Sequence, residues 1–556
     1  MNEPLIEKNV ECQLTDGTVL RADVYRPKKD GVYPVLLIRL PYDKETPRYY
    51  DEYLHVPRMV EAGYVVILQD VRGRFASDGE FYPFIHEADD GYESVEWAAS
   101  LPYSNGKVGL FGMSYHGFTQ LAAAAAFPPS LKAVAPVMTM ADPWADMLSG
   151  GSGPSSVGNI KTWTLASMVQ DELQRNNDPK AEQVNQYIEQ LPEWLHETPS
   201  NEWTPMKDLR PNSYFFDVIN ERVPASFREK MNVIDKLKDV SIPALFIGGW
   251  FDSLLKPTLK AYQAYGGEKM LWIGPWTHEE MTGRAGGKYF DNAQVEIGKD
   301  NIKDPTELHI LWFNHWLKGK PHTIEKPVHL YLMGQKRWEN YDRWPPSPVE
   351  EKTYYLHSKG AANSRSGDGA LTTSLSGNQA TDSLRLDPAN PVPTHGGGVL
   401  IAGHESGMFD QGDIQDRDDI LVYTSETLTH DIDILGTIHA EIWAASPSPL
   451  LDLFVRISDV EPNGKAYNIV DSFHRESVKE NEKVRVKMDV NHTAYRFQTG
   501  HKIRVEIAAS NAPMFDVNLN NGKTTKTASH GKAAYETIYH GGSCPSHIVL
   551  PISPYA

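Results

Sequence analysis

Three residues, Ser114, Asp252 and His278, have the side-chain types that a serine nucleophile, an orienting carboxylate and a general base require. A serine hydroxyl is a weak nucleophile at neutral pH, so it needs a base within hydrogen-bonding reach to take its proton. The carboxylate holds the imidazole in the tautomer that accepts this proton. Serine, acid and histidine follow one another along the chain in one of the orders in which such triads occur. We therefore predict that these three residues form a catalytic triad.

Ser114 lies in the segment GMSYHG (residues 112–117), which is close to the G-x-S-x-G pattern of a nucleophile elbow. The fifth place holds His116, and the second glycine comes one residue later, at Gly117. The segment joins an apolar run typical of a strand to a run of strong helix formers, which is the strand–turn–helix context of an elbow. A serine that only caps the helix is the alternative, and the motif by itself leaves both interpretations open.

Asp252 and His278 each come just after an apolar run of strand type. The carboxyl ends of parallel strands meet at one edge of a sheet, so residues in these places are expected to lie together. Taken singly, Asp252 could be a turn residue, and His278 is one of 20 histidines. Their order and matching positions favour the triad. Two competing serines lack this context, because Ser152 follows no strand and Ser543 precedes no helix.

A serine triad also needs hydrogen-bond donors for the oxyanion of its tetrahedral intermediate. The backbone N–H of Tyr115, directly after the nucleophile, is the first expected donor. The chain lacks the HGGG-type loop that supplies the second donor in many esterases. Tyr42 follows the first apolar run, and its phenol could point at the oxyanion, although a tyrosine in such a place is usually a packing residue.

The elements that carry these residues alternate between strand and helix patterns, which favours a parallel sheet covered by helices. Short apolar runs predict strands, and amphipathic or alanine-rich runs predict helices. The predicted strands are 34–40, 64–70, 107–112, 243–250 and 269–276, and the predicted helices are 86–101 and 115–127.

Two other regions have different patterns. Residues 142–240 carry several tryptophans and helix-like stretches, and we predict a helical cap inserted between two parts of the core, 1–141 and 241–350. Residues 351–556 begin with a stretch rich in Gly, Ser, Asn and Asp over 358–407, which predicts long loops. Period-two runs follow, such as KIRVEI (502–507) and two runs flanking a Pro-Asn-Gly turn. They predict an all-β domain, a two-sheet sandwich of jelly-roll type.

Composition excludes several classes of function. The chain has 556 residues and a formal net charge of −19, so we expect more than one domain and no binding to nucleic acid or anionic membranes. Its two cysteines, Cys12 and Cys544, exclude a disulfide framework and favour a reducing compartment. The N-terminal segment lacks a signal-peptide pattern, and no apolar run has the length of a membrane span. We expect a cytoplasmic protein with no cofactor and no metal.

With these residues in hand, the chain resembles the bacterial cocaine esterase family, whose members are called CocE/NonD hydrolases. That family is related to X-Pro dipeptidyl-peptidases and α-amino-acid ester hydrolases. The resemblance covers nearly the whole chain and rests on LPYDK (40–44), QDVRGRFASDGEF (69–81), GMSYHG (112–117), GGWFDS (248–253), GPWTH (274–278) and SGMFDQ (406–411). The elbow of that family reads G-x-S-Y-x-G, which accounts for the displaced glycine.

The resemblance implies an α/β fold with an α/β-hydrolase core, an inserted helical cap and a C-terminal all-β jelly-roll domain. It implies that Tyr42 is the phenolic oxyanion donor beside the Tyr115 amide. It also implies an acyl pocket between the three regions, and the residues that match the family's pocket regions are Trp144, Trp163, Leu254, Met408 and Phe409. Each of these five, taken alone, is more simply an ordinary core residue.

We therefore expect a serine carboxylic-ester hydrolase that works through an acyl-enzyme. Amino-acid ester hydrolases carry extra carboxylates just after the catalytic aspartate, whereas Asp252 is followed by Ser253 and two leucines. A cationic substrate would find no partner in this segment, so we expect neutral esters with an aromatic or aliphatic acyl group.

Two alternatives stay open from the sequence. An X-Pro dipeptidyl-peptidase or amide acylase on the same triad is one, and a binding protein with a vestigial site is the other. A small-molecule ester is the expected partner, and the sequence leaves a homodimer open.

Overall fold

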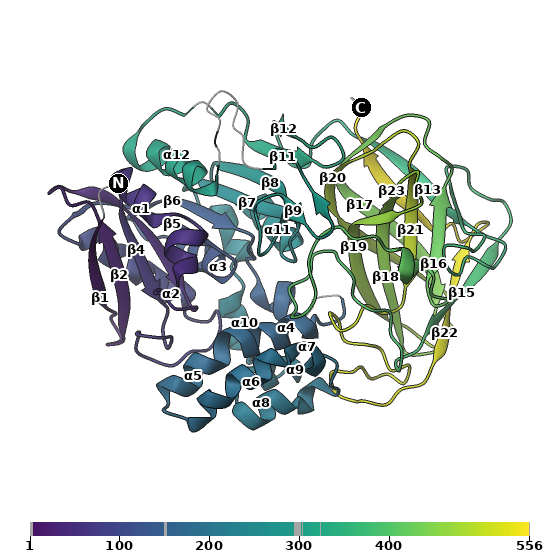
Figure 1. The fold of residues 1–556 in the computed structure, drawn as a ribbon, viewed down its shortest axis with the longest axis horizontal. Helices are drawn as coiled ribbons and strands as arrows, with labels where there is room; N and C mark the ends of the chain where they lie inside the picture. Colours follow the sequence, from purple (N-terminus) through teal and green to yellow (C-terminus); the bar gives the residue numbers. More distant parts are fainter. Residues whose placement is uncertain (1–3, 150–152, 294–301, 303, 323, 555–556) are drawn as a thin grey trace.

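The largest element of the core is a ten-stranded sheet. The computed structural model describes residues 4–149, 153–293, 302, 304–322 and 324–554 (Figure 1). In spatial order the strands are β1 (Leu5–Gln13), β2 (Val19–Arg26), β4 (Val65–Asp70), β3 (Tyr33–Leu40), β5 (Ser104–Met113), β6 (Leu131–Val137), β7 (Ala244–Phe251), β8 (Lys269–Thr277), β11 (Val328–Leu332) and β12 (Arg337–Tyr341). From β4 to β11 the neighbours pair in parallel, whereas β1, β2 and β12 are joined by antiparallel pairing.

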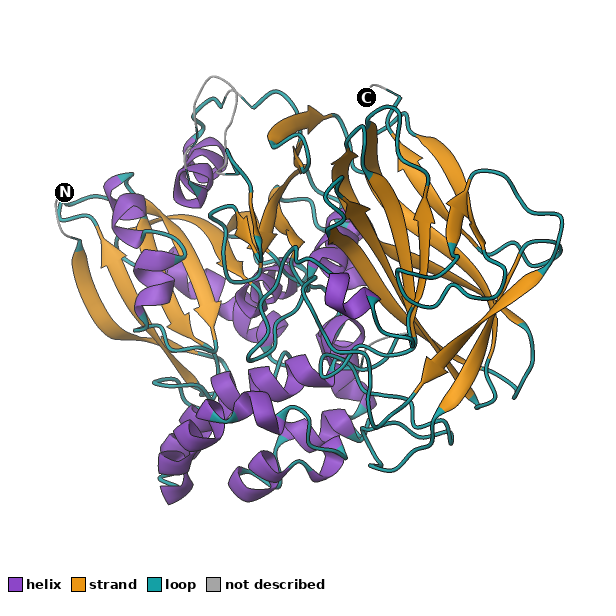
Figure 2. Ribbon diagram, turned by 45° about the vertical axis from the view of Figure 1, so that its right-hand side comes forward, coloured by secondary structure: helices purple, strands orange, loops and turns teal. Residues whose placement is uncertain are grey.

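Helices cover both faces of this sheet (Figure 2). Along β3, Val35 and Leu37 belong to one apolar cluster, and Leu36 and Ile38 belong to the other. A strand buried on both faces has to be apolar along its whole length, which is why these strands are continuous hydrophobic runs in the sequence. One face packs against α2 (Glu87–Ser100), α3 (Tyr115–Ala124) and α11 (Leu255–Ala264), and the other against α1 (Val56–Glu61) and α12 (Pro305–Lys318).

The predicted strands and helices of the core are confirmed within a few residues at each end. The five predicted strands correspond to β3, β4, β5, β7 and β8, and the two predicted helices to α2 and α3. The alternation of parallel strands and crossover helices is therefore present as expected.

A helical region lies between β6 and β7, as predicted, and no strand occurs there among the described residues. Its α-helices are α4 (Val157–Trp163), α5 (Val169–Arg175), α6 (Val184–Glu189), α7 (Leu191–Trp194), α8 (Thr204–Leu209), α9 (Tyr214–Ile219) and α10 (Ala225–Met231). A π-helical turn (Thr164–Met168) joins α4 directly to α5. Figure 1 shows this region lying below the sheet and beside the lower end of the all-β region.

The third region is all-β apart from the short helix α13 (Gly412–Gln415). Its strands are β13 (Glu350–His357), β14 (Ala370–Thr372), β15 (Ala380–Leu386), β16 (Leu421–Ser425), β17 (Ile432–Ala445), β18 (Leu450–Val460), β19 (Ala466–Ser477), β20 (Val484–Phe497), β21 (Lys502–Ala508), β22 (Ala534–His540) and β23 (His547–Ile552). The predicted hairpin around the Pro-Asn-Gly turn is confirmed as β18 and β19.

This region is all-β as predicted, and only its predicted loop region differs from the expectation. Hydrogen bonds join its strands into one 11-stranded sheet, because the long β17 pairs with β20, β22 and β23. The strand β19, at one end of this order, lies close to β20. The predicted loop region 358–407 also contains β14 and β15. In β15 the alternating burial of Leu384 and Leu386 against the domain core favours a strand over the turn-rich composition around it.

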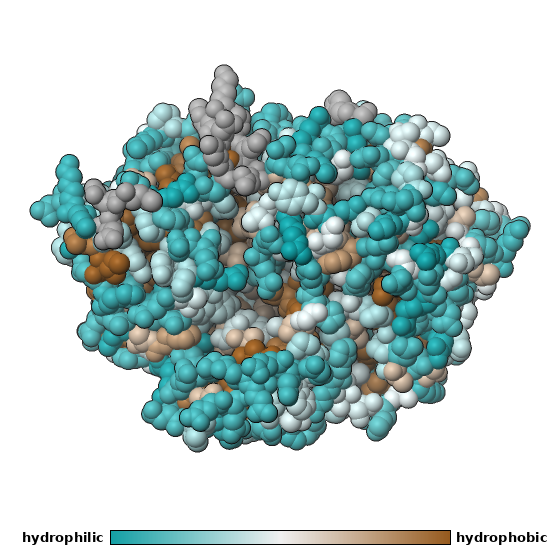
Figure 3. Space-filling model, viewed as in Figure 1, coloured by the Kyte–Doolittle hydropathy of each residue, from teal (hydrophilic) through white to brown (hydrophobic). Residues whose placement is uncertain are grey.

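The three regions meet around the carboxyl ends of the core strands. The backbone of the β domain at Gly398 and Gly407 lies directly against the backbone of Asp252 and Ala285. The helical region is joined to the β domain by backbone hydrogen bonds, among them those from the Ser200 N–H to the Thr525 carbonyl and from the Asn201 N–H to the Lys526 carbonyl. Figure 3 shows apolar atoms in the central hollow of this face.

Candidate active site

Ser114 lies in a sharp turn between β5 and α3. Its φ is 62° and its ψ is −124°, a conformation that a residue with a side chain adopts only under strain. Its N–H donates to the carbonyl of Val137 at 2.9 Å, which ties the turn to the end of β6. A strained residue between a parallel strand and the helix that follows it is the geometry of a nucleophile elbow.

The two glycines of this elbow are required by close contacts. A Cβ at Gly112, whose φ is 138°, would lie 2.6 Å from Cδ2 of His116. A Cβ at Gly117 would lie 2.6 Å from Cβ of Thr139, in the loop after β6. The small residue is therefore needed at position 117, which faces the neighbouring loop, and not at position 116.

His116 itself is a buried, neutral residue of the wall behind the elbow. Its ring lies edge-on to Tyr42, Tyr49 and Tyr53, with centroid distances of 6.0, 5.5 and 6.1 Å. Burial lowers its pKa to about 3, and neither ring nitrogen has a hydrogen-bond partner among the described residues. At neutral pH the imidazole is uncharged, so it packs as an aromatic ring.

Asp252 and His278 form a hydrogen-bonded pair. His278 Nδ1 lies 2.7 Å from Asp252 Oδ1, and both residues are buried. Phe251 pairs with Thr277 in the sheet, so the aspartate and the histidine leave β7 and β8 at the same level. With Nδ1–H held by the carboxylate, Nε2 is the nitrogen that can accept a proton.

The structure brings Ser114 to the same edge of the sheet as this pair. Met113 pairs with Val137, and these are the last residues of β5 and β6; Val137 in turn pairs with Ile247 in β7, which continues in the same direction to Phe251 and leads into Asp252. No hydrogen bond between Ser114 Oγ and His278 Nε2 occurs among the described residues. Catalytic hydrogen bonds in unliganded enzymes are often long and shorten when substrate binds.

Tyr42 places its phenol beside the elbow. The indole N–H of Trp163 donates to its hydroxyl at 3.0 Å. Burial raises the pKa of Tyr42 to about 12, while hydrogen bonds with Trp163 and Ser114 act in the opposite direction. The phenol is therefore protonated at neutral pH, next to the serine hydroxyl, and can donate to a developing negative charge.

The loop that carries Tyr42 is held by residues of the segment 69–81. The buried guanidinium of Arg74 donates to the carbonyls of Pro41, Ser167 and Met168, at 2.9, 3.0 and 2.8 Å. It thus connects the residue before Tyr42 to the π-helical turn that follows Trp163. The segment 69–81 thus supports the contact between the Tyr42 hydroxyl and the Trp163 indole, although none of its residues forms that contact.

Tyr115 presents its backbone and its side chain in different directions. It is the first residue of α3, so its N–H has no acceptor within the helix. Its phenol points away into the core, where it donates to Glu87 Oε1 and accepts from the Phe84 N–H, both at 2.8 Å. The Tyr115 amide is therefore available as an oxyanion donor, while its side chain anchors the helix.

A cavity of about 30 Å³ adjoins Ser114. It is lined by Tyr42, Phe84, Ser114, Tyr115, Met140, Met147, Asn159, Trp163, Ser253, Leu254 and Leu400. Core, helical region and β domain all contribute to this lining, and none of the described lining residues is charged. A cavity this small holds little more than a water molecule, so an acyl group has to displace side chains, which unbranched methionines permit.

Of the five residues predicted to bind substrate, Trp163 and Leu254 line this cavity. Trp144 lies under the guanidinium of Arg228 instead. Met408 and Phe409 pack against the backbone of Gly286, after β8. Their substrate contacts stay a prediction. Sequence patterns missed Asn159, Phe84 and the two methionines, because nothing in a sequence gives their depth beneath the surface.

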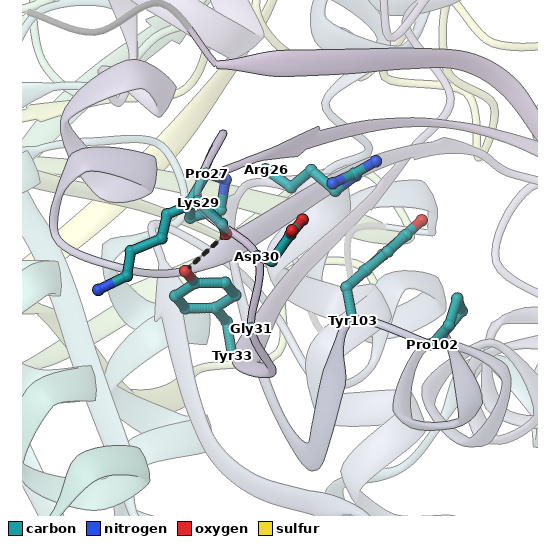
Figure 4. Close-up of a pocket in the computed structure, with 8 residues that line it drawn as sticks. All are labelled: Arg26, Pro27, Lys29, Asp30, Gly31, Tyr33, Pro102 and Tyr103. Atoms are coloured by element: carbon teal, nitrogen blue, oxygen red, sulfur yellow. Dashed lines mark hydrogen bonds between the residues drawn. The ribbon is translucent and has the colours of Figure 1, made fainter.

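A second hollow, of about 240 Å³, lies at the opposite edge of the sheet (Figure 4). It is formed by the turn between β2 and β3, where the Tyr33 hydroxyl donates to the Lys29 carbonyl at 2.9 Å, and by Tyr103 before β5. Ligands of parallel sheets bind at the carboxyl ends of the strands. This hollow is at the amino ends and has no nucleophile–base pair.

Neither a metal-binding cluster nor a membrane-spanning helix is present in the described part of the chain. No group of three or more His, Cys, Asp or Glu side chains there is placed to hold a metal ion. None of the helices described is long and apolar enough to cross a membrane.

Comparison with known proteins places the chain in a family. Residues 16–280 match the model for the X-Pro dipeptidyl-peptidase (S15 family), and residues 322–549 match that for the X-Pro dipeptidyl-peptidase C-terminal non-catalytic domain. Cocaine esterase from Rhodococcus sp. is 32% identical over 572 residues, which cover 98% of this chain and 98% of that protein. This chain belongs to the cocaine esterase family. It is a serine hydrolase, and the expected membership is confirmed.

Solved structures support the fold of this family. An α-amino acid ester hydrolase has a TM-score of 0.82 at 20% identity, covering 99% of this chain and 97% of that one. An aminopeptidase from a marine sediment Thaumarchaeota archaeon has a TM-score of 0.80 at 21% identity, covering 99% and 96%. At these identities the likeness concerns the fold alone. The predicted α/β-hydrolase core, helical cap and all-β jelly-roll domain are confirmed.

Proposed function

We propose that this protein is a carboxylesterase that hydrolyses neutral esters through an acyl-enzyme on Ser114. The observation that carries the proposal is the buried Asp252–His278 pair at the same sheet edge as the strained Ser114, beside an uncharged cavity. The family relationship to cocaine esterase, a named ester hydrolase, supports the same reaction.

In the acylation step, Ser114 Oγ attacks the ester carbonyl carbon while His278 Nε2 takes its proton. The Tyr42 hydroxyl and the Tyr115 N–H donate to the oxyanion, in a cavity where low polarity strengthens both hydrogen bonds. Asp252 keeps the imidazole oriented and stabilises the imidazolium. Collapse of the intermediate breaks the C–O bond to the alcohol, which leaves with the proton from His278.

In the deacylation step, water repeats the sequence. His278 Nε2 takes a proton from water, the resulting oxygen nucleophile attacks the acyl carbon, and the same two donors hold the second oxyanion. The bond to Ser114 Oγ then breaks, and His278 returns the proton to the serine.

An X-Pro dipeptidyl-peptidase activity is the second candidate, because both matching family models carry that description. A peptidase of this kind has to bind a free ammonium group. The described residues that line the cavity include no carboxylate to pair with it, and an unpaired buried charge is costly. The lining therefore supports esters over N-terminal dipeptides.

Kinetics on two substrate classes test the proposal. We expect turnover of phenylacetyl and butyryl p-nitrophenyl esters, weak or no turnover of Xaa-Pro-p-nitroanilides, and loss of ester turnover in Ser114→Ala by at least about 10³-fold. Preferred cleavage of the anilides would instead establish the peptidase. Near-full ester turnover in Ser114→Ala would contradict the role of Ser114, and absence of ester turnover in the unaltered protein would favour the binding protein with a vestigial site.

The cellular location, the domain boundaries and the absence of a nucleic-acid partner are also proposals. We propose a cytoplasmic protein, supported by two cysteines that are both buried and free. The boundaries at 141/142, 240/241 and 350/351 are proposed as the limits of core, cap and jelly roll. We propose no nucleic-acid partner, because the net charge is −19.

A further inference from the structure

Asn159, on the cap helix α4, has a side-chain amide without a partner. The residue is only 8% exposed, its Oδ1 is buried without a hydrogen bond, and no hydrogen bond of its Nδ2 occurs among the described residues. Buried amides in folded proteins are nearly always hydrogen-bonded, because leaving them unpaired costs stability. Other buried amides, such as Asn511, share this state, but Asn159 also lines the cavity that contains Ser114.

The lining of the cavity contains a second polar group without a hydrogen-bond partner among the described residues. Ser253, directly after Asp252, has a buried Oγ with no partner among the described residues. Both Asn159 and Ser253 line the cavity that contains Ser114. They come from two different elements, the cap helix α4 and the loop after β7, so the two groups are brought together only by the fold.

The remaining lining restricts what these two groups can bind. Apart from the reacting residues, Asn159 and Ser253, the described lining consists of aromatic residues, leucines and methionines, and it carries no charge. An ammonium or carboxylate on the substrate would therefore be buried without a counter-ion. An amide and a hydroxyl each donate and accept hydrogen bonds. The neutral substituent that matches both is a hydroxyl group.

We propose that Asn159 and Ser253 are specificity-determining residues that bind a neutral hydroxyl substituent on the acyl group of the ester. The apolar walls hold the rest of the acyl group. The inference rests on the proposed esterase function and adds to it the substrate class: esters of hydroxylated aromatic acids. The cost of two unpaired polar groups in the free enzyme is recovered when this hydroxyl binds.

Matched esters with the same methanol leaving group test the inference. Methyl mandelate, methyl 2-phenylpropanoate and methyl phenylglycinate place hydroxyl, methyl and ammonium at one position, and methyl 4-hydroxyphenylacetate and 4-methylphenylacetate form a second pair. The measured quantity is the ratio of kcat/KM for the hydroxylated ester to that for its methyl analogue. Comparing this ratio between enzymes cancels the intrinsic reactivity of the esters.

In Asn159→Leu we expect this ratio to fall by about tenfold or more in at least one of the two pairs, since sites built around a hydroxyl discriminate strongly against its absence. Ser253→Ala should lower the same ratio. The phenylglycinate should be the poorest of its three esters in the unaltered enzyme.

A matched control is Asn511→Leu. Asn511 is also buried, with an unpaired Oδ1, but it does not line the cavity, so its replacement should leave both ratios unchanged. Ratios that stay constant in Asn159→Leu and Ser253→Ala, or that fall equally in Asn511→Leu, would overturn the inference. So would a preference for the ammonium ester.

Fluorophosphonate labelling separates this inference from the proposed function. Asn159→Leu should still be labelled at Ser114, and its melting temperature should be at or above that of the unaltered protein, since a buried unpaired amide is removed. If the variants are labelled at Ser114 but their kcat/KM ratios equal those of the unaltered enzyme, the hydroxyl-binding site is contradicted and the proposed esterase function is not. Absence of labelling and of all ester turnover in the unaltered protein contradicts the proposed function and the inference with it.

Discussion

At Tyr42, two neighbours determine what the phenol can do. Trp163 donates to its oxygen, so the hydroxyl hydrogen is free to point toward Ser114. Burial keeps the group protonated, with a pKa of about 12. A donor that is oriented and protonated before substrate binds has no reorganisation cost during the reaction, and this is the source of most oxyanion stabilisation.

Tyr42→Phe tests this role. We expect kcat for p-nitrophenyl esters to fall by about 10²–10³-fold, as for removal of one oxyanion donor. Because the folded-state pKa of Tyr42 lies near 12, the phenol does not ionise up to about pH 10, so the kcat ratio should be constant from pH 7 to about 10. A ratio that shrinks as the pH rises through this range would mean that the phenol ionises near its ordinary pKa, contrary to the structure.

At this scale the sequence identified reacting residues better than binding residues. Ser114, Asp252 and His278 were predicted because each follows a recognisable strand, and the structure places all three at one sheet edge. Only the resemblance to the family indicates Met408 and Phe409 as substrate-binding residues, and neither of them lines the cavity. Asn159 gave no signal, because one asparagine on a helix has no pattern that reports what surrounds it.

At the scale of elements, the strand–turn–helix unit around Ser114 determines the position of the nucleophile. The positive φ of Gly112 turns the chain at the end of β5, and the elbow then needs Gly117 where α3 passes Thr139. The strain at Ser114 is held by hydrogen bonds to the end of β6 and by the packing of α3 on the sheet.

Gly112→Ala should destabilise this unit. The added methyl would lie 2.6 Å from the His116 ring, and the alanine backbone would have to adopt a positive φ. We therefore expect the free energy of unfolding, measured by urea denaturation, to fall by about 2–4 kcal/mol. Gly106→Ala is the control, because Gly106 is also at a positive φ in β5 but has open space around it. It should cost only about 1 kcal/mol. Equal losses in the two variants would contradict the close contact.

The core elements were predictable because strands buried on both faces are unbroken apolar runs. The elements of the β domain were harder to predict from sequence patterns. In β21, the alternation of apolar and charged residues in KIRVEI predicts that one face of the strand is exposed to solvent, yet Arg504 and Glu506 are buried. They are accommodated because Gln415 accepts from Arg504 and donates to Glu506, and such a network depends on a helix distant in sequence. Local patterns contain no information on partners of this kind.

At the scale of the whole molecule, the β domain completes the active site. Its backbone at Gly398 lies against the backbone of Asp252, and Leu400 lines the cavity. The cap supplies Asn159 and Trp163 from the other side. Three regions that are distant in sequence therefore control the shape of one cavity, and the position of Asp252 depends on how the β domain is packed.

Gly398→Ala tests this dependence. A Cβ at Gly398 would lie 2.9 Å from the carbonyl oxygen of Asp252, so the substitution should push the two backbones apart and lower kcat by about tenfold or more, because small misplacements of catalytic groups are costly. Gly377→Ala, in the same domain with no atom near its Cβ, should leave kcat unchanged. Unchanged kcat in both variants would show that the β domain does not position Asp252.

The most direct test of the whole account is to identify the acylated residue by mass spectrometry. The protein is mixed with a p-nitrophenyl ester, quenched in acid during turnover and digested. We expect an added acyl mass on the peptide that contains Ser114, and no such adduct in Ser114→Ala. An acyl group on another residue, such as Ser152 or Ser543, or turnover that persists in Ser114→Ala, would contradict the account.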